Sequence, residues 1–125
     1  MERSLILKQK ASQFLQDVAA GKIDEAYEEL VSEEFFHHNV WFPGDRESLK
    51  KAMKDHHLPG RKVVTKLGLC ENDKVMTLSH IQNKEDEAGY AVVHIFRFNA
   101  ENKIVEMWDT GAEIPKEMIN INGAF

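Results

Sequence analysis

Residues 90–110 restrict the fold more than any other part of the sequence. Two runs rich in β-branched and aromatic residues, 91–98 and 103–110, flank the polar tetrapeptide 99–102. Apolar runs of this length on either side of a short polar segment are typical of an antiparallel β-hairpin. The sequence therefore predicts two paired strands in this region.

The register of this hairpin decides which side chains share a face. Either Phe98 or Ala100 can lie opposite Lys103. These two registers differ by two residues, so every side chain keeps its face in both, and only a β-bulge would change the assignment. One predicted face carries Val92, His94, Phe96, Val105, Met107 and Asp109. The other carries Val93, Ile95, Arg97, Ile104, Glu106 and Trp108. Both faces are largely apolar, so we expect both to be covered.

Each face also holds one polar pair at direct or diagonal cross-strand distance, His94 with Asp109 and Arg97 with Glu106. A carboxylate among Val, Phe and Met side chains is costly to bury unless it is paired or protonated. His94 and Asp109 are therefore the first candidates for a functional site. The alternative for them is a buried His–Asp hydrogen bond that only steadies the hairpin. We expect Arg97 and Glu106 to form a structural ion pair on the outer face.

The rest of the sequence predicts three helices followed by strands. Apolar residues recur at helical spacing over residues 4–20, and Gly21 follows where a helix would end. Asp24 and Asp45 are placed to cap two further helices. Alternating patterns then predict four strands, at residues 62–70, 75–82, 91–98 and 103–110. This order indicates an α+β fold in which helices cover one side of a curved antiparallel sheet and enclose an apolar pocket.

Residues 32–45, S-E-E-F-F-H-H-N-V-W-F-P-G-D, are the least regular stretch and are predicted to form a loop. The stretch holds more aromatic and histidine residues than an exposed loop needs. His38 is a candidate to face the pocket as a hydrogen-bond donor or acid. Asn39 is a candidate to face the pocket as well, and the alternative is that it caps nearby backbone amides. Trp41 is a candidate to line the cavity, with a place in the core as the alternative.

Composition excludes several classes of protein. The 125 residues have ordinary globular composition, with 42% hydrophobic and 30% charged residues, and indicate one domain over residues 1–125. A net charge of −5 argues against a nucleic-acid partner. A single cysteine, Cys70, excludes an intramolecular disulfide and fits a reducing compartment. Without a signal peptide or an apolar run of membrane-spanning length, we expect a cytoplasmic protein with no membrane partner.

No motif in the sequence indicates a cofactor or a metal. There is no Gly-rich phosphate loop, no serine in a nucleophile elbow and no Cys/His cluster. The histidines His37, His38, His80 and His94 have no recognised ligand spacing. Of these, His80 lies on a predicted strand and is a candidate to contact a ligand, with the surface or the core as alternatives.

Five motifs spread over most of the chain point to one family. They are F-F-H-H-N at 35–39, P-G-D-R-E-S-L at 43–49, V-H-I-F-R-F at 93–98, K-I-V-E-M-W-D at 103–109 and N-I-N-G-A-F at 120–125. Together they resemble the SnoaL-like branch of the NTF2-like (cystatin-like cone) superfamily, and more closely its bacterial proteins known as predicted SnoaL-like aldol-condensation enzymes. Val40 departs from the proline usual after His-Asn, and Met107 from the histidine usual in E-H-W-D.

The resemblance implies a cone of three N-terminal helices on a curved four-stranded antiparallel sheet that encloses a pocket. In the polyketide cyclases of this branch, an Asp on a late strand is the general base and a His lies near it on the adjacent strand. His94 and Asp109 look like that pair.

We therefore expect a cofactor-independent acid–base enzyme that carries out aldol-type cyclisation or isomerisation of a carbonyl substrate. The expected base is Asp109, with His94 and His38 as polar partners. The expected ligand contacts are Asn39, Trp41, His80, Phe96 and Met107. A non-catalytic binding module for a small hydrophobic ligand is the alternative. We also expect a homodimer, and a scaffold that serves mainly for dimerisation through the outer sheet face is a third interpretation.

Overall fold

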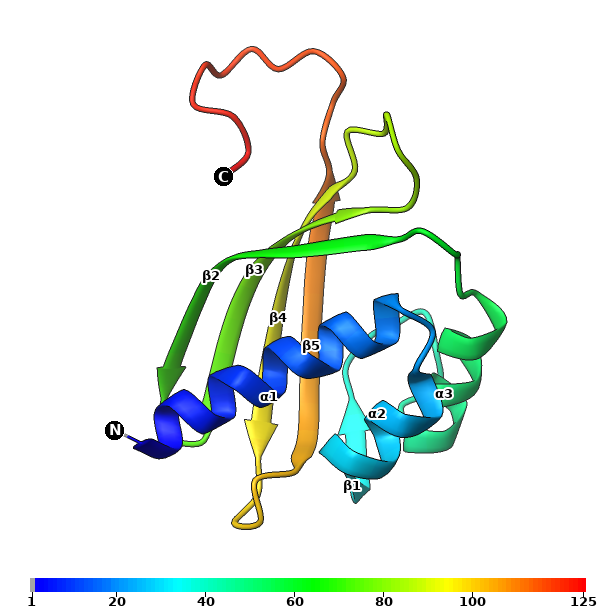
Figure 1. Ribbon diagram of the computed structural model, residues 1–125, viewed down its shortest axis with the longest axis vertical. Helices are drawn as coiled ribbons and strands as arrows, with labels where there is room; N and C mark the ends of the chain where they lie inside the picture. Colours follow the sequence, from blue (N-terminus) through cyan, green and yellow to red (C-terminus); the bar gives the residue numbers. More distant parts are fainter. Residues whose placement is uncertain (1) are drawn as a thin grey trace.

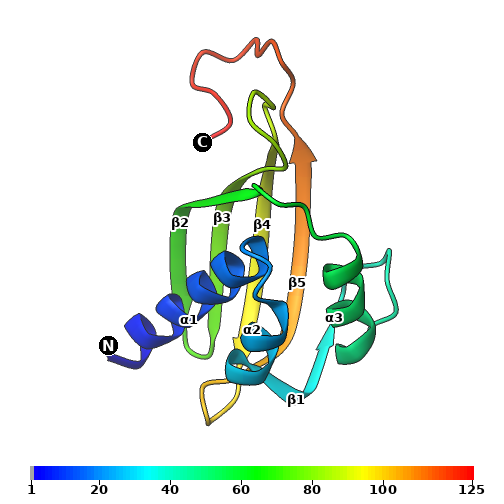
Figure 2. The same cartoon turned by 45° about the vertical axis from the view of Figure 1, so that its right-hand side comes forward.

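The computed structural model describes residues 2–125, which form three helices and one five-stranded sheet. The helices are α1 (Glu2–Ala19), α2 (Ile23–Leu30) and α3 (Arg46–Asp55). The strands are β1 (Val31–His37), β2 (Lys62–Glu71), β3 (Lys74–Gln82), β4 (Tyr90–Phe98) and β5 (Ile104–Glu113). The helices lie on one side of the curved sheet, as the sequence predicts (Figures 1 and 2). We call the face toward α1 the inner face and the opposite face the outer face.

Helix α1 forms most of the helical side of the core. Leu7, Ala11, Phe14 and Leu15 recur at helical spacing and are buried. The ring of Phe14 meets the ring of Phe96 on the inner face edge-on, with centroids 5.8 Å apart. Burying each large side chain of this kind stabilises the fold by roughly 1.5–3 kcal/mol. This packing fixes α1 across the inner face.

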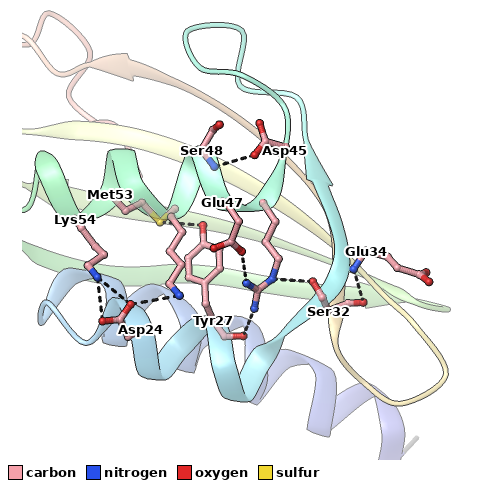
Figure 3. Close-up of polar contacts among 11 residues, drawn as sticks. Asp24, Tyr27, Ser32, Glu34, Asp45, Glu47, Ser48, Met53 and Lys54 are labelled. Carbon is pink, nitrogen blue, oxygen red and sulfur yellow. Dashed lines mark hydrogen bonds and ion pairs between the residues drawn. The ribbon is translucent and has the colours of Figure 1, made fainter.

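Helix α3 is held against α2 by side-chain contacts (Figure 3). As predicted, Asp45 caps α3, because its carboxylate accepts a hydrogen bond from the Ser48 backbone N–H at 2.9 Å. The Tyr27 hydroxyl donates to Met53 Sδ at 3.3 Å. The predicted cap at Asp24 is wrong, because Asp24 lies within the first turn of α2 and pairs with Lys54 Nζ at 3.0 Å. These contacts place the inner side of α3 beside the sheet.

The sheet has the strand order β1-β5-β4-β3-β2, and β1 runs parallel to β5 while the other pairs are antiparallel. Strand β2 starts on the side of the molecule where α3 lies and bends round toward the N-terminal end of α1 (Figures 1 and 2). The pairing of β2 shifts between Thr65 and Leu67, at an irregularity of the kind that bends a strand. This bend lets β2 close one side of the fold.

Strand β1 is a correction to the sequence analysis, which predicts a loop over residues 32–45 and a sheet of four strands. Phe35 and His37 are buried while Phe36 between them is exposed, so the first half of this stretch has the period of a strand. His37 pairs with Met107 of β5, which lies far later in the chain. The alternation of buried and exposed residues was not visible in the sequence, because two adjacent aromatic residues are followed by two histidines. The partner strand β5 also lies far away in the sequence.

The β4–β5 hairpin has, at its centre, one of the two registers that the sequence allows, and in it His94 lies opposite Asp109 and Arg97 opposite Glu106. A bulge follows between Arg97 and Phe98, and it brings Phe98 opposite Ile104. Ile104 is therefore 0% exposed in the core, although the sequence places it on the outer face. A one-residue slip of this kind reverses the face of the residue that follows it.

Candidate functional site

A mostly apolar cavity of about 260 Å³ lies between α1, α3 and the inner face of the sheet. Its apolar lining comes from Phe14, Leu15, Val18, Ala19, Phe42, Leu49, Ala52, Met53, Val63, Ile81 and Met107. Its polar lining comes from Asn39, His56, Arg61, Asn83, His94 and Asp109. The volume is just below the range of roughly 300–1,000 Å³ that is usual for ligand pockets, so a small molecule fits it best.

His94 lies on β4 at the inner wall of this cavity. The side chain is 9% exposed, and its ring stacks on Phe96 with centroids 5.7 Å apart. Its Nδ1 atom is buried and has no hydrogen-bond partner among residues 2–125. Burial lowers the pKa of His94 below its ordinary value of 6.5, and the charge of Asp109 only partly opposes this effect. The ring is therefore neutral at pH 7.

Asp109 lies opposite His94 on β5 and lines the same cavity. Its Oδ2 accepts a hydrogen bond from Asn39 Nδ2 at 3.3 Å. Within residues 2–125 the carboxylate has no ion pair and no hydrogen bond to His94. The alternative of a His–Asp hydrogen bond that only steadies the hairpin is therefore not what the structure shows. Both residues line the same cavity.

The cavity adjoins a shallower depression at the surface. This depression has a volume of about 610 Å³ and shares Asn39 and Asp109 with the cavity. Asp109 is half-buried, which fits its position between the two spaces. The Asn39–Asp109 hydrogen bond thus lies at the boundary between the apolar interior and the solvent-facing surface.

His37 positions Asn39, a role that the sequence does not indicate. The buried ring of His37 donates from Nε2 to the carbonyl oxygen of Pro43 at 2.7 Å and accepts at Nδ1 from the backbone N–H of Asn39 at 3.0 Å. The side-chain oxygen of Asn39 accepts from the backbone N–H of Trp41 at 3.0 Å. Because that oxygen is occupied, the NH₂ group of Asn39 is the end directed toward Asp109. Here Asn39 both caps the loop and faces the cavity.

His38 and Trp41 lie outside the cavity, contrary to expectation. Because β1 is a strand, His37 points inward and His38 points to the outer face. There His38 Nε2 pairs with Glu106 Oε2 at 2.6 Å and its ring stacks on Trp108 with centroids 4.9 Å apart. Trp41 is 86% exposed and borders only the surface depression.

Phe96 and His80 are likewise not part of the cavity lining. Phe96 is fully buried beneath the ring of His94, where it belongs to the core. His80 Nε2 donates to the carbonyl oxygen of Ala88 at 2.7 Å and so ties β3 to the following loop. Of the expected ligand contacts, Asn39 and Met107 do line the cavity.

Three polar residues at the cavity were missed by the sequence analysis: His56, Arg61 and Asn83. Arg61 Nε donates to Asn83 Oδ1 at 2.9 Å. Arg61 follows the Pro-Gly turn after α3, where a basic residue is typical of a solvent-exposed loop. Only the folded arrangement of α3, β2 and β3 reveals that it lines a cavity.

Residues 2–125 contain no group of three or more His, Cys, Asp and Glu side chains arranged to hold a metal ion. In the same part of the chain, no helix has the length and apolar character that crossing a membrane requires.

The sequence matches no protein-family profile, and no curated protein matches it. Solved structures, in contrast, match over most of the chain. An NTF-2 like protein of unknown function from Burkholderia xenovorans LB400 superposes with a TM-score of 0.72 at 16% identity, over 90% of this chain and 86% of that chain. A candidate ketosteroid isomerase from Kribbella flavida DSM 17836 has a TM-score of 0.73 at 11% identity, over 94% and 85% of the two chains.

A third structure is a candidate isomerase of the SnoaL-like family from Agrobacterium tumefaciens str. C58. It superposes with a TM-score of 0.70 at 8% identity, over 90% of this chain and 99% of that chain. The chain therefore has the NTF2-like cone fold, which SnoaL-like proteins share. At these identities the likeness concerns the fold, and the function must be argued from the site.

Proposed function

We propose that this protein is a cofactor-independent acid–base enzyme that acts on a small carbonyl compound in the inner cavity, by isomerisation or aldol-type cyclisation. One observation carries the proposal. His94 and Asp109 lie opposite each other on adjacent strands, face the same apolar cavity and form no hydrogen bond with each other. A carboxylate and an imidazole in that arrangement can both contact one bound molecule.

The proposed reaction begins with the transfer of a proton from the carbon next to the carbonyl group to the Asp109 carboxylate. The electron pair of that C–H bond moves toward the carbonyl oxygen, which becomes an enolate. A neutral His94 ring has one N–H to donate to this oxygen and does not neutralise Asp109 as an imidazolium would. Where a double bond is conjugated with the enolate, return of the proton from Asp109 to another carbon gives isomerisation. Where the substrate has a second carbonyl group, attack of the enolate carbon on it closes the ring, and the proton held by Asp109 passes to the new alkoxide oxygen.

The apolar lining supports this chemistry in two ways. It keeps most water from the inner part of the cavity, where His94 lies, and it strengthens each electrostatic contact there. The hydrogen bond from Asn39 holds Asp109 at the cavity wall without supplying a counter-charge. The similarity in fold to two structures described as candidate isomerases agrees with the proposal.

The experiment that tests the proposal is α-proton exchange in D₂O, followed by ¹H NMR, with 4-oxo-4-phenylbutanoate and its methyl ester as probes. We expect the wild-type protein to accelerate exchange next to the ketone. Asp109→Asn should lower the rate by roughly 10²–10⁴-fold, because it removes the base. Asp86→Asn is the matched control, since Asp86 is exposed on the β3–β4 loop outside the cavity and should leave the rate unchanged.

The alternative is a non-catalytic module that holds a small hydrophobic ligand, which the mainly apolar lining of the cavity favours. The same experiment separates the two functions. Binding of both probes without any acceleration of exchange supports the module and rejects the enzyme. Wild-type exchange rates in Asp109→Asn would also reject Asp109 as the base.

We also propose that two copies of the chain associate through the outer face of the sheet. Leu67 and Leu69 on this face are each 59% exposed, and Val64 and Met76 are exposed beside them. The Arg97–Glu106 pair on the same face is satisfied within the chain, so the exposed apolar side chains are what the face offers to a partner. An apolar patch of this kind can pack on its own copy across a two-fold axis. A second copy is therefore the partner that fits this face.

A further inference from the structure

We propose that the ligand of the cavity is a carbonyl compound with a carboxylate group, and that Arg61 binds this carboxylate. The position of the carbonyl group beside Asp109 rests on the proposed function. The anion site at Arg61 rests on separate contacts, so the two can fail independently.

Arg61 is held at the cavity by its neighbours. The residue is half-buried just before β2, and its Nε donates to Asn83 Oδ1 at 2.9 Å. Asn83 is itself fixed after the end of β3, where its backbone N–H donates to Glu87 Oε2 at 2.7 Å. The guanidinium plane is therefore oriented before any ligand arrives, which lowers the entropy lost on binding.

Most hydrogen-bond donors of Arg61 are still available. A guanidinium has five N–H groups. Asn83 takes the one at Nε, and Nη2 makes only a long contact of 3.5 Å to the carbonyl oxygen of His56. Within residues 2–125, Nη1 has no hydrogen-bond partner and the guanidinium forms no ion pair. The group can therefore offer a fork of N–H donors to a ligand.

The other three arginines show how different Arg61 is. Arg46 pairs with Glu47 at 2.6 Å, and Arg97 pairs with Glu106 at 2.8 Å. Arg3 is exposed at the surface and donates to Asn102 and to the carbonyl oxygen of Asn99. Arg61 alone lines the apolar cavity, in a chain with 21 acidic and 16 basic residues that offers many carboxylates. An unpaired cation in this setting favours an anion from outside the protein.

A carboxylate is the anion that fits best. Its two oxygens match the planar fork of a guanidinium, and the cavity is small. Asp109 lines the same cavity, and within residues 2–125 it forms no ion pair with Arg61. Asp109 would repel the carboxylate of a ligand while Arg61 attracts it. The two charges together orient a keto acid with its anionic end at Arg61 and its ketone toward His94.

The test compares 4-oxo-4-phenylbutanoate with its uncharged methyl ester, using calorimetric or NMR titration. We expect the wild-type protein to bind the acid more tightly than the ester. Arg61→Gln should weaken binding of the acid by roughly 10- to 100-fold, as for the loss of a charge-assisted hydrogen bond, and change binding of the ester by less than about 2-fold. Arg3→Gln, the same substitution outside the cavity, should change neither.

Two further measurements keep the proposal open to rejection. Arg61→Lys keeps the charge but loses the planar fork, so it should bind the acid with intermediate affinity. If Arg61→Gln does not fold, the comparison of acid and ester on the wild-type protein still decides. Three outcomes would each overturn the carboxylate site. The wild type could bind acid and ester equally, or Arg61→Gln could weaken binding of both by the same factor. Inorganic phosphate could also displace the acid at a lower concentration than the acid itself requires.

The outcomes also separate this inference from the proposed function. Tight binding of the acid that depends on Arg61, without α-proton exchange, rejects the enzyme and keeps the anion site. If the protein accelerates α-proton exchange in acid and ester at equal rates and binds both with equal affinity, the proposed enzyme stands and the anion site is rejected.

Discussion

The β4–β5 hairpin carries two polar cross-strand pairs that differ in how far their hydrogen bonds are satisfied. On the outer face, Glu106 receives hydrogen bonds at both carboxylate oxygens, from Arg97 Nε at 2.8 Å and from His38 Nε2 at 2.6 Å. On the inner face, His94 and Asp109 lie opposite each other without a hydrogen bond between them. The two pairs belong to the same strands and lie a few residues apart.

The difference shows how to tell a structural pair from a candidate site. Burial alone would raise the pKa of Glu106, but the hydrogen bonds from His38 and Arg97 outweigh it and hold the pKa below its usual range. That carboxylate is satisfied by the protein itself. At His94, burial lowers the pKa and an unpaired Nδ1 persists in the interior. A buried polar atom without a partner costs stability, so the inner pair, unlike the outer one, is not satisfied by the protein itself.

The largest expected effect comes from removing the outer carboxylate. Glu106→Ala leaves Arg97 and His38 without their shared acceptor and should lower the free energy of unfolding by about 1.5–3 kcal/mol. Asp109→Asn should change it by less than about 0.5 kcal/mol, because Asp109 has only one long hydrogen bond. Urea unfolding of both variants measures this difference. Equal losses in the two variants would contradict the contrast between the faces.

A smaller effect is expected in the pH dependence of stability. The pKa of His94 is below 6.5 in the folded protein and about 6.5 in the unfolded chain, so between these values the unfolded chain binds more protons. Stability should therefore fall as the pH decreases below about 6.5, with at most about 1.4 kcal/mol per pH unit from this one group. His94→Gln should lose that part of the slope. Denaturant midpoints of the wild type and the variant, measured at several pH values, isolate the contribution of His94. An equal slope in the two proteins would contradict the prediction.

The smallest effect on folding stability is expected from the apolar part of the outer face. Leu69→Lys places a charge on an exposed position and should change the free energy of unfolding of the monomer by less than about 0.5 kcal/mol. The same change should abolish association of two copies if the outer face is the interface. Sedimentation at several concentrations measures this, and a wild-type protein that is monomeric at all of them would remove the proposed dimer.

Local sequence patterns predicted much of the fold and part of the candidate site. The alternation of residues 91–98 and 103–110 was enough to place His94 and Asp109 on one face at direct or diagonal distance, because strand parity depends only on neighbouring residues. It also predicted the Arg97–Glu106 pair. The α3 cap at Asp45 was predictable for the same reason, since a cap involves residues three apart.

The features that sequence patterns missed depend on distant parts of the chain. Strand β1 exists because it docks on β5, and without that partner residues 32–45 have the composition of a loop. Because this strand was not predicted, the sequence also did not indicate that His37 points inward and His38 outward. The bulge that buries Ile104 lies beside the turn, in which Asn102 adopts a positive φ of 60°, and the alternating pattern of the strands does not reveal it. Arg61 reaches the cavity only through the packing of three separate elements.

The parallel docking of β1 on β5 has a consequence for the order in which the molecule assembles. Asn39 directly follows β1, and β1 gains its partner strand only when residues near Met107 are in place. Contacts between such distant segments close late in folding, because the intervening chain must lose entropy first. An incomplete or partly folded chain therefore lacks the amide that holds the carboxylate at the cavity wall. The Asn39–Asp109 contact would be completed as one of the last events on the way to the native state.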